Sequence, residues 1–240
     1  MQKVQNFLIH SMFGLIYIYS LRGAYTMEQY LIDLIERMSE KTVIKPGVIF
    51  DSSRDSVSWI AYREAEKLRD EKYIIQLTDY IVDEERIMFR KSAYFILGNL
   101  LTKFKSLEAI QFYVDRLLVE TNTMILDSML CSLYLIRKGP TIDISPIIKC
   151  TENINKMIRS SAIRALATTS HESAKEKIRT IVQLKDHKKY KYEIIYAIQT
   201  LSTIGDINDI DFIKPLYSSC VRDIQVSAKY AVESLEYSYT

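Results

Sequence analysis

One small-residue position recurs along this chain at intervals of 31 to 36 residues, and it constrains the fold more than any other feature. Alanine fills five of its six occurrences, and a leucine, alanine or valine follows four residues later. Self-similarity at this period is typical of stacked repeats, whose units bury their apolar faces only against neighbouring units. We call this position the slot, and its members are Ala61, Ala93, Met129, Ala162, Ala197 and Ala228.

Each slot lies in an amphipathic helical pattern, and a second such pattern precedes it, for example at residues 73–82 and 109–118. Turn residues such as Gly139 and Gly205 separate the units. With only 6 Gly and 4 Pro in 240 residues, the chain lacks the chain breakers that a β-rich or doubly wound fold needs. We therefore predict an all-α fold. It is a right-handed α-solenoid, or α-α superhelix, of about six helix pairs from residue 44 onward, with a capping helix at residues 28–40.

Residues 90–97 and 159–166 share the form Arg-x-Ser-Ala-x-x-x-Leu, and residues 204–206 read Ile-Gly-Asp. This helix and its ending resemble HEAT repeats, especially the short type also found in phycobilisome-lyase proteins. The resemblance covers about 197 of the 240 residues and is weaker in units one and three, where Ser58 and Leu126 replace the arginine. It implies an α-solenoid of HEAT-like helix pairs, and the fold by itself implies no particular activity.

The first 26 residues stand apart from the repeats. Residues 7–21 are apolar but shorter than the about 20 residues that span a bilayer. Arg22 occupies the −3 position of the only signal-peptide cleavage candidate, where small residues are required. We predict that Met27 is the true start, that residues 1–26 are a non-native or flexible extension, and that residues 27–240 form one HEAT-like repeat domain.

The side of each slot-bearing helix that faces away from the slot is predicted to line a concave groove. It combines aromatic and arginine side chains, a composition typical of protein-interface hot spots. Burial of Trp59 and Phe95 against neighbouring helices remains an open alternative. The predicted partner-binding residues are Trp59, Arg63, Lys91, Phe95, Asp127, Lys156, Arg164, Lys191, Arg222 and Tyr230.

Charge is unevenly distributed although the formal net charge is only +2. Residues 51–85 hold ten acids against five bases, whereas residues 149–191 hold eleven bases against four acids. Such an arrangement orients a charged partner as it approaches. The small total charge favours a partner protein with an acidic surface over nucleic acid. A basic patch is predicted at Lys185, Lys188, Lys189, Tyr190 and Tyr192.

Motifs for catalysis are missing from the sequence: it has no Gly-rich phosphate loop, no G-x-S-x-G and no H-E-x-x-H. His171 and His187 lie in hydrophilic turns and are expected to be solvated surface residues. The three cysteines, Cys131, Cys150 and Cys220, are dispersed, which favours buried thiols in a reducing, cytoplasmic setting. We expect no enzyme activity, catalytic residue, metal, cofactor or membrane span.

Two functional hypotheses follow. The first is a non-catalytic scaffold that holds a partner protein in its concave groove, such as an adaptor. The chain also resembles small bacterial HEAT-like proteins that serve as immunity proteins, which implies toxin neutralisation. The second is nucleic-acid binding or base excision, as in HEAT-like DNA glycosylases, with Trp59, Asp127 and Arg164 on the groove. A bilin-lyase role is a further alternative that the repeat type implies.

Overall fold

The computed structural model describes residues 27–40 and 56–238, and the regular elements in these ranges are helices. The predicted extension at residues 1–26 lies outside the described residues. Slot-bearing helices, here called B helices, are α3 (Val57–Ala65), α5 (Ile87–Leu101), α7 (Thr123–Leu135), α9 (Lys156–Ala165), α11 (Lys191–Ile204) and α13 (Arg222–Ser238). The A helices that precede them are α2 (Gln29–Ser39), α4 (Lys72–Asp83), α6 (Leu107–Asp115), α8 (Ser145–Cys150), α10 (Glu172–Val182) and α12 (Ile210–Ile213).

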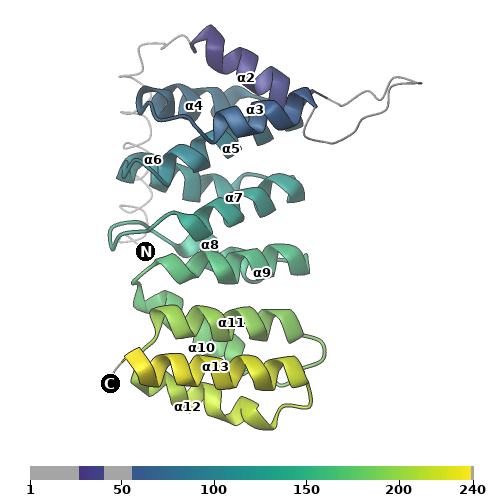
Figure 1. Cartoon of the computed structure of the whole chain (residues 1–240), viewed down its shortest axis with the longest axis vertical. Helices are drawn as coiled ribbons and strands as arrows, with labels where there is room; N and C mark the ends of the chain where they lie inside the picture. The colour runs from purple at the N-terminus through teal and green to yellow at the C-terminus, as the bar shows by residue number, and fades with distance from the viewer. Residues whose placement is uncertain (1–26, 41–55, 239–240) are drawn as a thin grey trace, which may run out of the picture.

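The helices stack as pairs along the long axis of the molecule (Figure 1). From α5 onward, each B helix contacts the B helix of the next pair. Helix α2 packs against α3 and α5, so the predicted capping helix also serves as the A helix of the first pair. The stretch that was expected to hold an A helix, residues 44–55, lies outside the described residues. The predicted all-α solenoid is confirmed.

The slots explain how neighbouring pairs approach. All six slot residues have no exposed surface, and the residues four positions later are 0 to 3% exposed. Alanine at the slot removes the side-chain bulk that would hold two helices apart. Gly98 on α5 marks a similarly close approach. A Cβ atom there would lie 2.7 Å from Oγ of Ser132 on α7 and 2.9 Å from the hydroxyl oxygen of Tyr113.

The arginine of the Arg-x-Ser-Ala motif ties three chain segments together. Its Nη1 donates to the two carbonyl oxygens just before the helix N-cap, at 2.9 and 3.1 Å for Arg90 and at 3.0 and 2.9 Å for Arg159. Each guanidinium also binds a glutamate of the following repeat: Arg90 Nε lies 2.8 Å from Glu120, and Arg159 Nη2 lies 2.6 Å from Glu193. The motif is therefore a connector between repeats.

The serine of the same motif connects in the opposite direction, to the preceding repeat. Ser161 donates to the Asp127 carboxylate at 2.6 Å, and Ser92 lies 3.0 Å from the hydroxyl of Ser39. Since both serines are buried, these bonds also satisfy polar groups that water does not reach.

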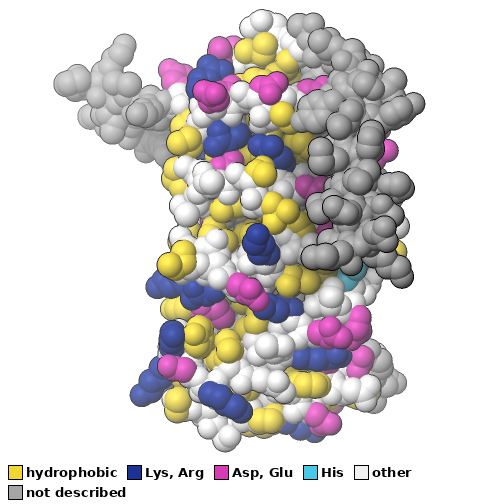
Figure 2. Space-filling model, turned by 180° about the vertical axis from the view of Figure 1, so that it is seen from behind, with side chains coloured by type: hydrophobic (Ala, Val, Ile, Leu, Met, Phe, Trp, Pro, Cys, Tyr) yellow, Lys and Arg dark blue, Asp and Glu magenta, His cyan; other side chains and the backbone are white. Residues whose placement is uncertain are grey.

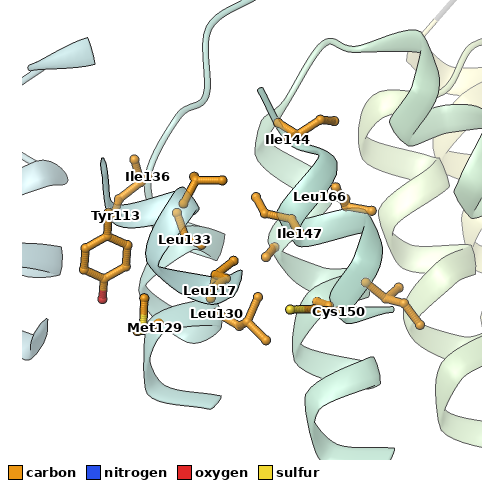
Figure 3. Close-up of a cluster of buried hydrophobic side chains, with 14 of the residues drawn as sticks. Tyr113, Leu117, Met129, Leu130, Leu133, Ile136, Ile144, Ile147, Cys150 and Leu166 are labelled. Carbon is orange, nitrogen blue, oxygen red and sulfur yellow. The ribbon is translucent and has the colours of Figure 1, made fainter. Parts of the chain in front are cut away.

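A continuous hydrophobic core runs through the stack from Leu31 to Leu235. Figure 3 shows its middle, where side chains of α7 such as Leu130 meet Ile147 and Cys150 of α8. The short α8 thereby joins the third and fourth pairs, and no single pair buries its apolar face alone.

Lys138 is a charged residue inside this core, with 1% of its surface exposed. Its Nζ donates to the carbonyl oxygens of Leu133 and Ile136, at 2.7 and 2.9 Å, and to Oγ1 of Thr168. The ammonium group thus caps carbonyls at the end of α7. Burial lowers the pKa of Lys138 to about 7.

Two sequence-based expectations about single residues are wrong. The histidines are not simply solvated: His171 Nε2 lies 3.1 Å from the carbonyl oxygen of Gly139, and His187 Nδ1 lies 2.8 Å from Oγ of Ser219. Each half-buried ring bridges to a turn of an adjacent repeat, because the repeat places these turns side by side. Of the cysteines only Cys150 is buried, whereas Cys131 and Cys220 are exposed.

Candidate partner-binding face on the B helices

The predicted partner-binding residues form one face of the B helices, which we call the B-helix face. The fold places them there because they lie two or six residues before the slot, or two after it, on the side of the helix that faces away from the core. None of the ten is buried.

The N-terminal end of this face carries the only tryptophan. The Trp59 side chain is 38% exposed, and the guanidinium carbon of Arg63 lies 5.4 Å from the centre of its ring. Phe95 is half-buried and packs edge-on against Tyr62, with ring centroids 4.8 Å apart. Trp59 is therefore a surface residue, whereas much of Phe95 supports the packing of α3 on α5. Lys91 is half-buried beside them on α5.

The middle of the face is hollowed between α7, α9 and α11, over a volume of about 350 Å³. We call this the Arg164 hollow. It brings together four predicted residues, three on the face and one from the basic patch. Its lining residues are Asp127, Cys131, Lys156, Met157, Ser160, Ser161, Arg164, Tyr192, Glu193 and Tyr196.

Arg164 is held between two aromatic rings of adjacent repeats. Its guanidinium carbon lies 4.9 Å from the ring centre of Tyr134 on α7 and 5.6 Å from that of Tyr196 on α11. Within residues 27–40 and 56–238, no carboxylate lies at ion-pair distance from Arg164 or from Lys156. The hollow therefore presents two cations that form no ion pair with a described carboxylate, and one of them lies between two aromatic rings.

Both carboxylates of the hollow already have partners. Asp127 accepts the hydrogen bond of Ser161, and Glu193 is bound by Arg159. Burial raises the pKa of the Cys131 thiol, and the nearby Asp127 carboxylate raises it further, so this cysteine is not an activated nucleophile.

At the C-terminal end, two of the predicted residues are exposed and one is paired. Tyr230 is 69% exposed and Arg222 is exposed as well. Lys191 forms an ion pair with Asp223 at the start of α13, and its ammonium nitrogen lies 5.4 Å from the ring centre of Tyr192.

The predicted basic patch divides into two parts. Lys185, Lys188 and Lys189 are exposed in the turn before α11. Tyr190, in contrast, is half-buried and packs against the core, and Tyr192 belongs to the Arg164 hollow. The sequence predicted one continuous patch. The structure separates it into three exposed lysines, here called the lysine turn, and one tyrosine, Tyr192, in the Arg164 hollow.

Sequence reasoning missed the apolar rim of this face, although it named one member, Tyr192, as part of the basic patch. Met124, Met157 and Tyr192 each lie five residues before a slot and are 53, 55 and 56% exposed. That offset holds a large apolar side chain in the four middle repeats, where it is Met88, Met124, Met157 and Tyr192, and a polar one in the first and last. Tyr134 and Tyr196 were missed because the long side chain of Arg164 reaches sideways to adjacent helices, which a single helical wheel does not show.

A second hollow, of about 380 Å³, lies at the turns around Arg90 and Glu120. Its two arginines are engaged within the fold, since Arg90 binds Glu120 and Arg116 donates to the hydroxyl of Tyr94 at 3.0 Å. Figure 2 shows the reverse side of the stack, where charges of both signs are scattered among apolar side chains. The B-helix face is thus the best-defined candidate site.

Residues 27–40 and 56–238 contain neither a metal-site candidate nor a helix that could span a membrane. Among these residues, no group of three or more His, Cys, Asp or Glu side chains is placed to hold a metal ion. None of the helices in these ranges combines the length and apolar character that crossing a bilayer requires.

No family model and no curated protein matches this chain. Among solved structures, it is similar to a designed armadillo repeat protein, at 15% identity and a TM-score of 0.48. It is also similar to a protein described as computationally designed for modular peptide recognition, at 14% identity and a TM-score of 0.48. Each match covers 85% of this chain and 99% of the other. The evidence for the solenoid is the stacking of paired helices and the burial of the slot residues.

Proposed function

We propose that this chain is a non-catalytic scaffold that binds a partner protein on its B-helix face. The observation that carries the proposal is the Arg164 hollow, where two cations outside any ion pair leave one net positive charge beside exposed apolar side chains. Free cations and exposed aromatic rings side by side are the composition of interface hot spots.

The rest of the face supports the same function. Trp59 and Tyr230 lie at opposite ends of the face, both with substantial exposed ring surface. Rigid aromatic side chains of this kind bind at low cost in conformational entropy. A stacked scaffold can therefore contact an extended partner at several repeats at once.

Toxin neutralisation and adaptor function are specific forms of this binding, and we retain both as proposals. Each would use the same face, since each requires only that a partner surface is covered or held. The three free thiols fit a reducing compartment, and we propose a cytoplasmic setting.

Nucleic-acid binding is the second candidate. It is favoured by the lysine turn, where Lys185, Lys188 and Lys189 are exposed. The glycosylase-like arrangement gains less support: Asp127 and Arg164 line one hollow, but Trp59 on α3 is not among its lining residues. No feature of the described residues points to bilin attachment.

The test is recovery of the partner from cells that express a tagged chain. We expect a stoichiometric protein partner with the wild type. Recovery should fall at least tenfold with the double variant Trp59→Ala, Tyr230→Ala. It should stay unchanged with Tyr217→Ala, which removes a surface ring from the 3-10 helix η5 (Lys214–Ser218) after α12. Recovery of nucleic acid without a protein partner, lost in a variant with Lys185, Lys188 and Lys189 changed to Glu, would favour the second candidate.

A further inference from the structure

We propose that the Arg164 hollow binds a single carboxylate side chain, next to an apolar residue, in an extended acidic segment of the partner protein. This inference rests on the proposed scaffold function and deepens it by naming the chemistry that is recognised.

The first argument is the geometry of Arg164. The rings of Tyr134 and Tyr196 belong to the repeats on either side and lie within 6 Å of its guanidinium carbon. A guanidinium is planar, and aromatic rings beside it restrict the orientation of that plane. Its paired N–H donors are then positioned to match the two oxygens of a carboxylate. Because these donors are not used by a carboxylate of the described chain, they are available to a ligand.

The second argument is charge. The hollow contains the cations Lys156 and Arg164 and the carboxylate of Asp127, while Glu193 is neutralised by Arg159. One net positive charge remains, which complements one carboxylate. A phosphate dianion would leave excess negative charge next to Asp127, and this argues against phosphate as the preferred ligand.

The third argument is the apolar rim. Met157 and Tyr192 are exposed by 55 and 56% and both line the hollow. Methionine adapts its shape to varied apolar partners, and tyrosine offers a flat ring. The residue adjacent to the carboxylate is therefore expected to be aliphatic or aromatic.

The binding test uses two display libraries of twelve-residue segments without cysteine, one with glutamate and one with glutamine fixed at the centre. Selection on the wild-type chain should enrich only the glutamate library, with apolar residues beside the acid. Affinity of the enriched segments should fall at least tenfold with Arg164→Gln or Lys156→Gln and partly with Arg164→Lys. Lys188→Gln, outside the hollow, should leave it unchanged.

Cysteine protection locates the bound segment. Cys131 lines the hollow and Cys220 is exposed elsewhere, so a maleimide can label both in one molecule. An enriched segment should slow labelling of Cys131 at least fivefold and leave Cys220 unchanged. This contrast does not depend on the folding of any variant.

Three results would overturn the inference. These are equal enrichment from both libraries, no binder from either, and protection of Cys131 by a single-stranded oligonucleotide but by no segment. Segments that bind with Arg164→Gln as tightly as with the wild type, but not with Trp59→Ala, would also overturn it while leaving the scaffold function intact.

Discussion

The guanidinium of Arg159 binds the carboxylate of Glu193, which lies 34 residues further along the chain, with 2.6 Å between Nη2 and Oε1. Arg90 and Glu120 form the same contact two pairs earlier in the stack, at 2.8 Å. The glutamates are nearly inaccessible, with side chains 6 and 2% exposed. Buried ion pairs thus connect repeats that the apolar core also joins.

Removal of one partner from such a pair should be costly. Arg159→Gln leaves the Glu193 carboxylate buried without its counter-charge, and we expect a loss of about 3 kcal/mol in the free energy of unfolding. The double variant Arg159→Met, Glu193→Met should recover a large part of it. Urea denaturation measures both. A loss below about 1 kcal/mol, equal to that of Arg164→Gln, which breaks no ion pair with a described carboxylate, would contradict the connector role.

The close approach at Gly98 makes a second prediction. Gly98→Ala places a methyl group 2.7 Å from Ser132 Oγ, so the helices α5 and α7 must separate. We expect a cost of about 2 kcal/mol, typical of overpacking. Gly139→Ala is the matched control, because no atom lies within 4 Å of its added Cβ, and it should change stability by less than about 0.5 kcal/mol. Equal effects of the two substitutions on the free energy of unfolding would show that α5 and α7 pack more loosely than the 2.7 Å distance at Gly98 implies.

Slot substitutions test the repeat itself. Ala162→Leu inserts bulk where the alanine is fully buried and should cost about 2 kcal/mol. Met129→Ala removes a fully buried side chain and should cost about 3 kcal/mol through the cavity that it leaves. Thermal unfolding monitored by circular dichroism follows both variants. If the third pair left as little space at its slot as the other pairs do, Met129→Ala would instead have little effect on stability.

Lys138 predicts a specific pH dependence. Its pKa is about 7 in the folded chain and the ordinary 10.5 when unfolded. Between these values the unfolded chain binds the extra proton, so this group makes the folded state more stable as the pH rises. The free energy of unfolding of the wild type, minus that of Lys138→Met, should therefore increase between pH 7.5 and 9.5. The slope should approach about 1.4 kcal/mol per pH unit, the limit for one proton. A difference that does not change with pH would show that the ammonium stays charged in the core.

The repeat and its buried positions could be predicted from the sequence because alanine and leucine recur at one spacing in every unit. Ala162 and Leu166 are as inaccessible as their position in the helical pattern requires. The stripe that faces away from the slot was also predictable, since it follows from the same period.

Other features depend on contacts between repeats, which local patterns do not show. Lys138 follows Arg137 and precedes Gly139 in what reads as a polar turn, yet its side chain enters the core to meet the end of α7. Tyr190 belongs to a string of lysines and still packs inward. The Arg164 hollow needs side chains from three B helices, so its aromatic neighbours emerge only from the stacking.

Site-specific photo-crosslinking tests the central claim, partner binding on the B-helix face, most directly. A photoreactive amino acid at Ser160, in the hollow, is compared with one at Glu176, which is exposed on α10. After irradiation in cells that express the chain, mass spectrometry identifies the crosslinked species. We predict one protein joined efficiently through position 160 and at least tenfold less through position 176. Equal crosslinking at the two positions, or crosslinks at 160 only to nucleic acid, would contradict the account.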